Sequence, residues 1–279
     1  MKIIEDISEM QSLAGSARGA GTAITLVPTM GFLHAGHEEL LRVARGKAGF
    51  LILSIFVNPA QFGPNEDYKT YPRDMDADIK VALSSGVDCV FAPRPEEMYP
   101  DGFQTYTQVE RLSMGLCGEA RPGHFKGVAT VVLKLFNIVM PHVAVFGKKD
   151  YQQFVLIRRM VRDLNLDVEV VGVETVRESD GLAMSSRNSY LDADERKAAV
   201  CIPRALDEAR SALSGEDAQA VIRMVKKNIE NEPLAVIEYI KVCDKDTLQA
   251  LDRIEAGAML LLAVRIGKTR LIDNCLFTG

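Results

Sequence analysis

The chain has 279 residues, which is enough for one large domain or two of ordinary size. Hydrophobic residues make up 47% of it and charged residues 25%, proportions typical of a globular protein with a proper core. The formal net charge of −5 argues against a broad surface for nucleic acid or anionic membrane, although it leaves room for a local basic pocket that binds a small anion.

Neither the N-terminal residues nor the cysteines indicate an exported or membrane-bound protein. The stretch MKIIEDISEM is acidic and lacks the apolar core of a signal peptide. No stretch approaches the roughly 18 uninterrupted apolar residues of a membrane span. The five cysteines are widely spaced without a Cys-x-x-Cys pair, which favours buried thiols over a disulfide framework or a zinc site. We therefore expect a cytoplasmic protein that acts on small molecules.

The first two-thirds of the chain alternates between two kinds of pattern. Near-continuous apolar runs rich in β-branched residues predict strands buried on both faces at 22–28, 50–57, 88–92, 142–146 and 167–173. Helical patterns lie between them, at 36–48, 74–85, 124–139 and 150–164. This strand–helix repetition predicts an α/β fold with a doubly wound parallel sheet.

The pattern changes after about Val176. A polar loop, ESDGLAMSSRNSYLD, leads to two expected helices, at 192–213 and 216–230, with a break at Ser214-Gly215 between them. Strand-like runs follow at 236–243, 258–266 and 269–273. The sequence thus predicts a first domain over 1–176 and a smaller α+β domain over 177–279.

The stretch VPTMGFLHAGHEELL places two histidines where the first expected strand gives way to a helix. In an open parallel sheet, ligands bind beyond the carboxyl ends of the strands, and a helix N-terminus there suits phosphate. Gly36 would let a ligand approach the backbone, and His34 and His37 could donate hydrogen bonds to phosphate oxygens. Two other interpretations stay open here: a metal site, although no Glu-x-x-His or cysteine pair completes one, and incidental histidines of which one caps the helix.

Two further clusters could bind phosphate, and each also has an ordinary structural explanation. In FGKKDYQQF, which follows another expected strand, either lysine could meet a phosphate as a point charge, or the turn could simply be solvated. In GLAMSSRNSYL, the hydroxyls of Ser185 and Ser186 and the guanidinium of Arg187 form a good phosphate-binding set, or a polar surface loop.

The fourth cluster is FVNPAQFGPNEDYKTYPRD, whose apolar first part contains the amides of Asn58 and Gln61. Asn58 and Gln61 among aromatic residues are typical of a pocket that orients a small polar substrate. The end of the stretch, Arg73 and Asp74 after Pro72, is equally typical of a helix cap. No cluster identifies a function alone, so the identification depends on their order and joint placement.

Several stretches follow one another in a characteristic order from near the N-terminus to the last expected strand: PTMGFLHAGH, SIFVNPAQF, YPRD, RPGHFKGVATVV, FGKKDYQQ, VRESDGLAMSSRNSYL and RIGKTRLIDN. Taken together they resemble the pantoate–β-alanine ligase (AMP-forming pantothenate synthetase) family. The HxGH motif alone occurs across a nucleotidyltransferase superfamily that includes class I aminoacyl-tRNA synthetases. NPAQF, KDYQQ and GLAMSSRN together are specific to the family.

The resemblance implies a Rossmann-like N-terminal domain of the HxGH superfamily, a smaller C-terminal domain that acts as a lid, and a homodimer. It also implies an enzyme that condenses (R)-pantoate with β-alanine to give pantothenate, on the way to coenzyme A. The pantoate carboxylate attacks the α-phosphorus of ATP, giving pantoyl adenylate and pyrophosphate, and the β-alanine amine then displaces AMP. Mg²⁺ would neutralise the leaving pyrophosphate, and no nucleic acid or membrane partner is expected.

The resemblance also assigns the ATP site residue by residue. His34 and His37 are expected on the phosphates, with His37 as proton donor, and with Lys149 and Arg187 they form the expected catalytic set. A carboxylate that attacks a triphosphate brings negative groups together, so these four side chains must offset that charge. The full expected ATP-binding set is Met30, Gly31, Phe32, Leu33, His34, Ala35, Gly36, His37, Gly147, Lys148, Lys149, Asp150, Val176, Met184, Ser185, Ser186 and Arg187.

The acid site is assigned to two glutamines. Gln61 is expected to bind pantoate and β-alanine, Gln153 to bind pantoate, and Asn58 to support this pocket. A nucleotidylyltransferase that makes a dinucleotide would need additional basic residues for its phosphorylated acceptor, whereas this apolar pocket suits a methyl-bearing hydroxy acid. The acidic charge argues against an RNA-binding synthetase relative, and the intact HxGH and SSR sets argue against an inactive binding module.

Two positions depart from the family's pattern. Lys148 stands where the family commonly has Glu, and we expect a modest effect on nucleotide binding. Asp76 and Asp78 flank Ala77 where the family often has adjacent acidic residues associated with magnesium, so the metal ligands stay unassigned. The stretch 127–140 is apolar on nearly every face, which places it in the core or partly at a subunit contact.

Overall fold

The computed structural model describes residues 1–64, 66–211 and 214–278, and the chain packs into two compact units. The first unit comprises Met1–Ser113, Arg121–Lys148 and Leu156–Glu174. The second comprises Met114–Ala120, Lys149–Val155 and Thr175–Gly279. The last two residues of the helix expected at 192–213 and the last residue of the domain expected at 177–279 lie outside the described residues.

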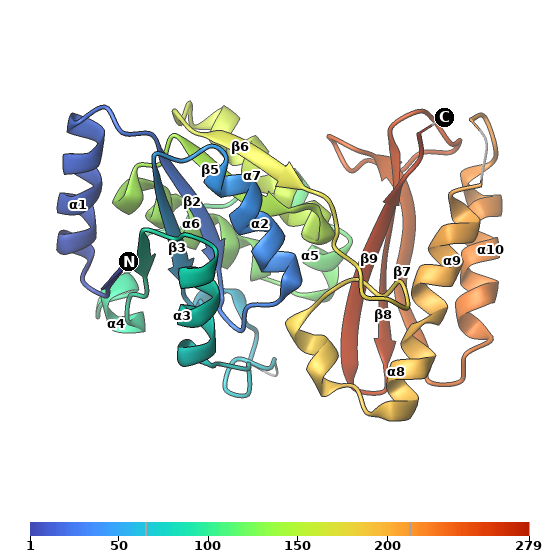
Figure 1. Cartoon of the computed structure of the whole chain (residues 1–279). Coiled ribbons are helices and arrows are strands. Elements are labelled where there is room, and N and C mark those ends of the chain that lie inside the picture. Colours follow the sequence, from blue (N-terminus) through green and yellow to red (C-terminus); the bar gives the residue numbers. More distant parts are fainter. Residues whose placement is uncertain (65, 212–213, 279) are drawn as a thin grey trace. The chain divides into compact units, whose positions relative to one another are not determined.

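A six-stranded parallel sheet forms the centre of the first unit (Figure 1). Its strands are β1 (Lys2–Ile4), β2 (Ile24–Thr29), β3 (Phe50–Ile55), β4 (Cys89–Phe91), β5 (Val143–Gly147) and β6 (Glu169–Val173). The five expected strands are confirmed to within two residues at each end. The sequence did not predict β1, because its three residues are too few to show a periodic pattern.

The strand order, β1-β4-β3-β2-β5-β6, creates a topological switch point between β2 and β5. From β2 the chain moves to β3 and β4 on one side, whereas β5 pairs with the other side of β2 and leads to β6. Right-handed crossovers in opposite directions put helices on both faces, which makes the sheet doubly wound as expected. Ligands of such folds bind at the carboxyl ends of the strands at this point, so the segments after Thr29 and Gly147 are where a site is expected.

The helices that cover the sheet are α1 (Ile7–Gly19), α2 (Ala35–Arg45), α3 (Met75–Ser84), α4 (Pro95–Met98), α6 (His124–Val139) and α7 (Tyr151–Asp163). On one face, α2 and α3 pack on the strands, with Leu41 and Ala82 in the same cluster as Val27 (Figure 1). The four helices expected in this part of the chain are confirmed. The sequence did not predict α1, which buries only Met10 and Ala14 and so has a weak apolar stripe.

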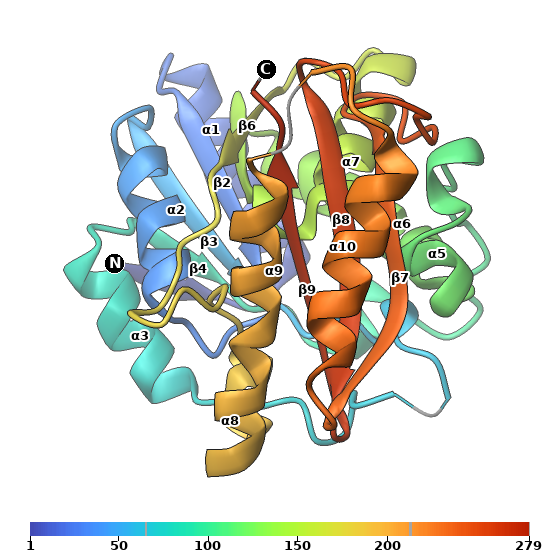
Figure 2. The ribbon, with the colours of Figure 1, turned by 90° about the vertical axis from the view of Figure 1, so that its right-hand side faces the viewer.

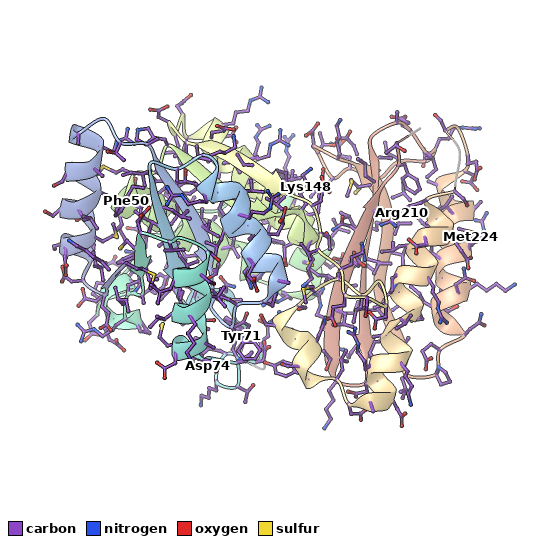
Figure 3. The ribbon with its side chains drawn as sticks, in the orientation of Figure 1. Phe50, Tyr71, Asp74, Lys148, Arg210 and Met224 are labelled. Carbon is purple, nitrogen blue, oxygen red and sulfur yellow. The ribbon has the colours of Figure 1, made fainter. Side chains whose placement is uncertain are left out.

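The start of α3 is capped as the sequence allowed. Asp74 is its N-cap, and its side chain accepts a hydrogen bond from the N–H of Ala77 at 3.0 Å (Figure 3). Arg73 takes no part in the cap, since its guanidinium donates to the carbonyls of Tyr68 at 2.9 Å and Tyr71 at 3.0 Å. The cap interpretation is therefore confirmed for Asp74.

Within the first unit, α6 is a core helix. Its side chains are buried along most of its length, with exposed positions such as Lys126 and Asn137. It packs against the short 3-10 helix η1 (Pro59–Gln61), and the contact is between backbones: a Cβ added at Gly127 would lie 2.1 Å from the carbonyl oxygen of Ala60. A glycine is therefore required where α6 meets η1.

A three-stranded antiparallel sheet backed by helices forms most of the second unit (Figure 2). Its strands, in the order β7-β8-β9, are β7 (Ala235–Asp244), β8 (Ala258–Ile266) and β9 (Thr269–Leu276), and its helices are α5 (Cys117–Ala120), α8 (Ala193–Ala199), α9 (Cys201–Ala209) and α10 (Ala218–Glu230). The apolar sides of α9 and α10 form one core with β8 and β9. The α+β character of this part is confirmed.

One expected helix of this unit is divided in two. The sequence predicted a continuous helix from residue 192, whereas α8 ends at Ala199 and α9 begins at Cys201. Pro203 explains the division, because it has no N–H to donate to the carbonyl of Ala199. Among the helices that the structure describes, none is both long and apolar enough to cross a membrane.

Candidate active site

A buried carboxylate determines the shape of the turn after β2, Met30–Leu33. Asp78 reaches back from the first turn of α3 and accepts hydrogen bonds from the N–H groups of Phe32 at 2.8 Å and Leu33 at 2.7 Å. Gly31 and Phe32 have φ values of 80° and 52°, in the left-handed region. A Cβ at Gly31 would lie 2.7 Å from Asp78 Oδ2, so the turn requires glycine there.

These contacts also bear on the two acidic residues considered for magnesium. Asp78 is buried, and burial raises the pKa of its carboxyl, against the lowering effect of its two backbone hydrogen bonds. Asp76 is exposed, and residues two apart do not share a face of a helix. Within the described ranges, no three His, Cys, Asp or Glu side chains gather as metal ligands would. Asp76 and Asp78 therefore do not form a two-carboxylate metal site.

His34 and His37 cap the N-terminus of α2 reciprocally. Nδ1 of His34 accepts from the N–H of Gly36 at 3.1 Å, and Nδ1 of His37 accepts from the N–H of His34 at 3.3 Å. The ring centroids are 4.1 Å apart. Because each Nδ1 is an acceptor, the proton of each neutral ring is on Nε2. The capping interpretation is confirmed, and it gives both imidazoles an Nε2–H donor at the carboxyl end of β2.

The segment after β5 continues as a single turn of 3-10 helix, η3 (Lys148–Asp150). Lys148, labelled in Figure 3, forms an ion pair with Glu174, whose side chain is mostly exposed. An exposed pair of this kind adds little to stability. It does, however, partly offset the positive charge of Lys148.

The side chain of Lys149, the next residue, is affected mainly by burial, unlike that of Lys148, which pairs with an exposed carboxylate. Burial lowers its pKa, the charges of Asp150 and Asp273 act in the opposite direction, and the charge of Arg187 lowers the pKa further. The main chain at Lys149 is also held, since its carbonyl accepts a hydrogen bond from Nδ2 of Asn274 at 3.0 Å. The side chain of Lys149 is thus partly desolvated, and its backbone is restrained.

The expected ATP-binding residues Val176 and Met184 are joined across a narrow loop. The N–H of Met184 donates to the carbonyl of Val176 at 2.9 Å, and Arg177 and Ala183 form an antiparallel bridge beside them. Arg177 also forms a bidentate pair with Asp273, at 2.7 and 2.9 Å. The Asp273 side chain is only 1% exposed, so this pair anchors the loop to β9 from inside the unit.

The serine-rich stretch after Met184 forms the 3-10 helix η4 (Ser186–Tyr190). Ser185 is its N-cap, and the hydroxyl accepts from the N–H of Arg187 at 3.3 Å. Ser186 is buried, and Asn188 donates to the carbonyl of Ala183 at 3.1 Å. The serine-rich stretch is therefore an ordered turn with defined donors and acceptors.

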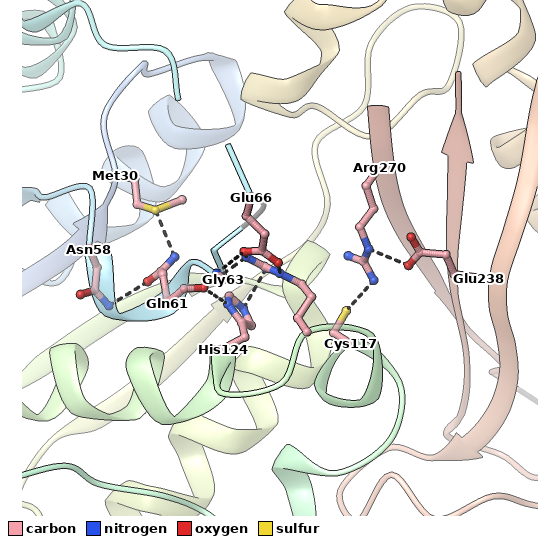
Figure 4. Close-up of polar contacts among 10 residues, drawn as sticks. Met30, Asn58, Gln61, Gly63, Glu66, Cys117, His124, Glu238 and Arg270 are labelled. Atoms are coloured by element: carbon pink, nitrogen blue, oxygen red, sulfur yellow. Dashed lines mark hydrogen bonds and ion pairs between the residues drawn. The ribbon is translucent and has the colours of Figure 1, made fainter. Parts of the chain in front are cut away.

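The amide of Gln61 has a determined direction (Figure 4). Asn58 Nδ2 donates to the carbonyl of Gly127 at 3.1 Å and to Oε1 of Gln61 at 3.2 Å, while its Oδ1 accepts from the hydroxyl of Tyr99 at 2.8 Å. A carbonyl can only accept, so the orientation of Asn58 is settled, and Gln61 must turn its oxygen toward it. Nε2 of Gln61 then lies 3.1 Å from Sδ of Met30.

The backbone of Gln61 is held by residues at the start of α6 (Figure 4). Its carbonyl accepts hydrogen bonds from Nδ1 of His124 at 2.8 Å and from Nη2 of Arg121 at 3.3 Å. Arg121 also forms a fork with Glu66, at 2.7 and 2.6 Å, and the N–H of Gly63 donates to the same carboxylate at 3.1 Å. These contacts fix the loop that carries Gln61.

The Glu66–Arg121 pair should make the stability of the protein depend on pH in acid. Burial alone would raise the pKa of Glu66, but the hydrogen bonds and charge of Arg121 outweigh it and lower the pKa to about 2. A carboxyl whose pKa is depressed in the folded state stabilises the fold above its unfolded pKa, and this contribution is lost as the pH falls toward the folded value. The loss should therefore fall between pH 4.5 and about 2.

Glu66→Gln should lower the free energy of unfolding at pH 7 by on the order of 3 kcal/mol, and the difference from wild type should disappear toward pH 2. Urea unfolding at a series of pH values measures it. Glu97→Gln, which breaks the exposed pair with Arg94, is the control and should change stability little at any pH. A difference that is independent of pH between 7 and 3 would contradict the role assigned to the Glu66 charge.

Within each unit the structure brings expected site residues together. In the first, the contact of Gln61 with Met30 joins the expected acid site to the turn that precedes α2. In the second, Lys149 lies within the electrostatic reach of Arg187. Gln153 lies half-buried in the first turn of α7.

Sequence reasoning missed the residues that support this site. The sequence indicates Asp78 only as a candidate for magnesium, and nothing local to Tyr99, which follows the short helix α4, indicates a role. Arg121 and His124 lie in RPGHF, a stretch that contributed to the resemblance without a role. Two basic side chains beside a glycine at a helix start were the only available signal for them.

Comparisons with known proteins agree over nearly the whole chain. Residues 2–276 match the model of the pantoate–β-alanine ligase family. A pantothenate synthetase of Syntrophotalea carbinolica is 56% identical over 276 residues, covering 98% of both chains. One of Geobacter sulfurreducens is 54% identical over 277 residues, covering 99% of this chain and 98% of its own.

Solved structures give the same result. The crystal structure of pantothenate synthetase from Thermus thermophilus matches with a TM-score of 0.93 at 43% identity, covering 100% of both chains. That of pantoate–β-alanine ligase from Francisella tularensis, complexed with β-γ ATP and β-alanine, matches with a TM-score of 0.81 at 36% identity, covering 99% of this chain and 97% of its own. The resemblance seen in the sequence motifs is confirmed, and the chain belongs to the pantoate–β-alanine ligase family.

Proposed function

We propose that the chain condenses pantoate with β-alanine in an ATP-dependent reaction that gives pantothenate, AMP and pyrophosphate through a pantoyl adenylate. The observation that carries this proposal is the geometry of His34 and His37, which cap α2 through Nδ1 and hold their protons on Nε2 at the carboxyl end of β2. Family membership supports the same reaction, as do the β-γ ATP and β-alanine of the Francisella tularensis complex.

In the first half-reaction, a carboxylate oxygen of pantoate attacks the α-phosphorus of ATP, and the bond from that phosphorus to the pyrophosphate breaks. Negative groups approach one another, so the site must supply positive charge and hydrogen-bond donors in advance. We assign the Nε2–H groups of His34 and His37 as hydrogen-bond donors to phosphate oxygens. Lys149 and Arg187 offset the developing charge, and Asp150 helps to keep Lys149 protonated against the effect of burial.

The acid site is proposed around Gln61 and Gln153. Pantoate offers a carboxylate and hydroxyls for amide groups and two methyl groups for an apolar surface. Asn58 fixes the direction of the Gln61 amide, which is what an orienting pocket requires. We assign the apolar surface to Phe56, a buried residue of the same stretch of chain.

In the second half-reaction, the neutral amine of β-alanine attacks the carbonyl carbon of the adenylate. The bond from that carbon to the phosphate oxygen of AMP breaks, and the amine nitrogen loses a proton. Gln61 is proposed to bind β-alanine as well as pantoate, which would place the two acids next to each other. Because the adenylate reacts with water, we propose that residues 177–279 act as a lid.

Three further properties belong to this proposal. Magnesium would enter with ATP and would neutralise the leaving pyrophosphate; no side chain is assigned to it, and Asp78 instead holds the backbone N–H groups of Phe32 and Leu33. A homodimer follows from the resemblance to the family. A cytoplasmic location is supported by the cysteines, all five of which are free.

ATP–pyrophosphate exchange tests the proposal directly. The protein is incubated with MgATP and labelled pyrophosphate, with and without pantoate, in the absence of β-alanine. We expect exchange only when pantoate is present, and release of AMP with formation of pantothenate once β-alanine is added. Exchange that pantoate does not support, but another carboxylic acid does, would show that the acid has been wrongly assigned.

A further inference from the structure

Alternate residues of β9 face two different surroundings, as the period of a strand requires. Leu271 and Cys275 belong to the apolar core formed with α9 and α10. Arg270 and Asn274 point the other way and bind two short segments from elsewhere in the chain, 114–120 and 149–155. One face of the strand therefore builds the core, and the other attaches to the segment that carries Lys149.

Asn274 makes the first attachment. Its Nδ2 donates to the carbonyl of Lys149 at 3.0 Å, and the residue is only 8% exposed. The main chain of Asn274 is itself fixed, because its N–H donates to Oδ1 of Asp273 at 2.7 Å, and Asp273 is paired with Arg177. A rigid donor thus sets the point from which the long Lys149 side chain extends.

Arg270 makes the second attachment, four residues earlier on the same face of β9. Its Nη2 donates to Sγ of Cys117 at 3.5 Å, and its Nε donates to Glu238 at 2.7 Å (Figure 4). The hydroxyl of Tyr239 lies 3.0 Å from the same sulfur. The N–H of Cys117 donates to Oε1 of Gln152, in the first turn of α7, at 3.0 Å. β9 therefore holds the segment from Lys149 to Gln152 through two of its residues. Asn274 binds the segment directly, and Arg270 binds it through Cys117; the two lie roughly 13 Å apart along the strand.

We propose that Asn274 is a positioning residue for Lys149 in adenylate formation, with Arg270 holding the other end of the same turn. This rests on the proposed function, in which Lys149 offsets phosphate charge. In this role Asn274 acts through the main chain of Lys149, to which its amide donates, and not on the nucleotide or the acid. A lysine is a preorganised donor only if its backbone cannot shift, because a misplacement of about 1 Å costs up to about 100-fold in rate.

The test is a double-mutant cycle measured by pantoate-dependent ATP–pyrophosphate exchange. Asn274→Ala should lower kcat about 10- to 100-fold and leave the KM for pantoate within about twofold. In a Lys149→Ala background, the same change should lower kcat by less than about twofold, because Asn274 acts through the lysine. Asn274→Leu keeps the branched shape without the donor, and it should reproduce the loss seen with alanine.

Cys275→Ala is the matched control, since Cys275 is the next residue of β9, is also buried and faces the core instead of Lys149. It should weaken packing and leave kcat unchanged. Additive losses in the cycle, or an unchanged kcat in Asn274→Ala beside a large loss in Lys149→Ala, would overturn the positioning role alone. An unchanged kcat in Lys149→Ala would overturn the role of Lys149 in the proposed function together with the inference.

Discussion

Replacing His37 by alanine should lower pantoate-dependent ATP–pyrophosphate exchange by about 10²–10³ while the protein stays folded. The structure gives the reason: Nδ1 of His37 accepts the N–H of His34, so the ring carries its hydrogen on Nε2, which can donate a hydrogen bond to a phosphate oxygen. Alanine removes that donor and loses one capping hydrogen bond of α2, which costs about 1 kcal/mol. Initial rates at saturating ATP and pantoate measure the effect, and urea unfolding checks the fold.

Two variants make this experiment specific. His37→Gln keeps an amide N–H near the position of Nε2 and should retain more activity than His37→Ala. His142→Ala is the matched control, because Nδ1 of His142 also accepts a backbone N–H, that of Ile24 at 3.0 Å, but at the amino ends of β2 and β5. It should leave the rate unchanged. A rate in His37→Ala within about threefold of wild type would remove His37 from the chemistry.

Gly127→Ala should cause a large loss of both stability and activity. An alanine Cβ would lie 2.1 Å from the carbonyl oxygen of Ala60 and 2.6 Å from the N of Gln61, and both are backbone atoms. The helix α6 must then move away from η1, which would break the Asn58 hydrogen bond to the Gly127 carbonyl. We expect the free energy of unfolding to fall by about 2–4 kcal/mol, from overpacking and the lost hydrogen bond.

The kinetic constants of Gly127→Ala should show that the substitution affects the acid site more than the ATP site. Because Asn58 sets the direction of the Gln61 amide, the KM for pantoate should rise more than the KM for ATP. Gly15→Ala is the control, since Gly15 lies within α1 with no atom within 4 Å of an added Cβ. It should stabilise the protein by about 0.5–1 kcal/mol. A Gly127→Ala protein with wild-type stability and an unchanged KM for pantoate would contradict the assigned contact.

The arrangement of strands and helices in the first unit could be predicted because a strand and a helix each leave a pattern within a short segment of sequence. A strand buried on both faces is a continuous apolar run, and the covering helices repeat every 3.6 residues. The prediction failed where that signal was weak or interrupted. β1 has three residues, α1 buries two, and Pro203 divides what otherwise reads as one helix.

The candidate site could be predicted only in part, for a related reason. The order of the motifs identified the stretches that hold His34, Gln61 and Lys149, because each motif is an unbroken run of residues in the sequence. Their supports come from distant parts of the chain. Asp78 lies 46 residues from Phe32, to which it binds, and nothing local to either residue indicates the contact.

The sequence by itself determined the family, the α/β and α+β character of the two parts, and the residues expected to carry the chemistry. These depend on patterns within short segments and on the order of those segments. Only the tertiary structure decided the direction of each polar group: the Nε2 protons of His34 and His37, the orientation of the Gln61 amide, and the attachment of Lys149 to Asn274. The reason is physical, since a hydrogen bond takes its direction from its partner, and the partners here become neighbours only when the chain folds.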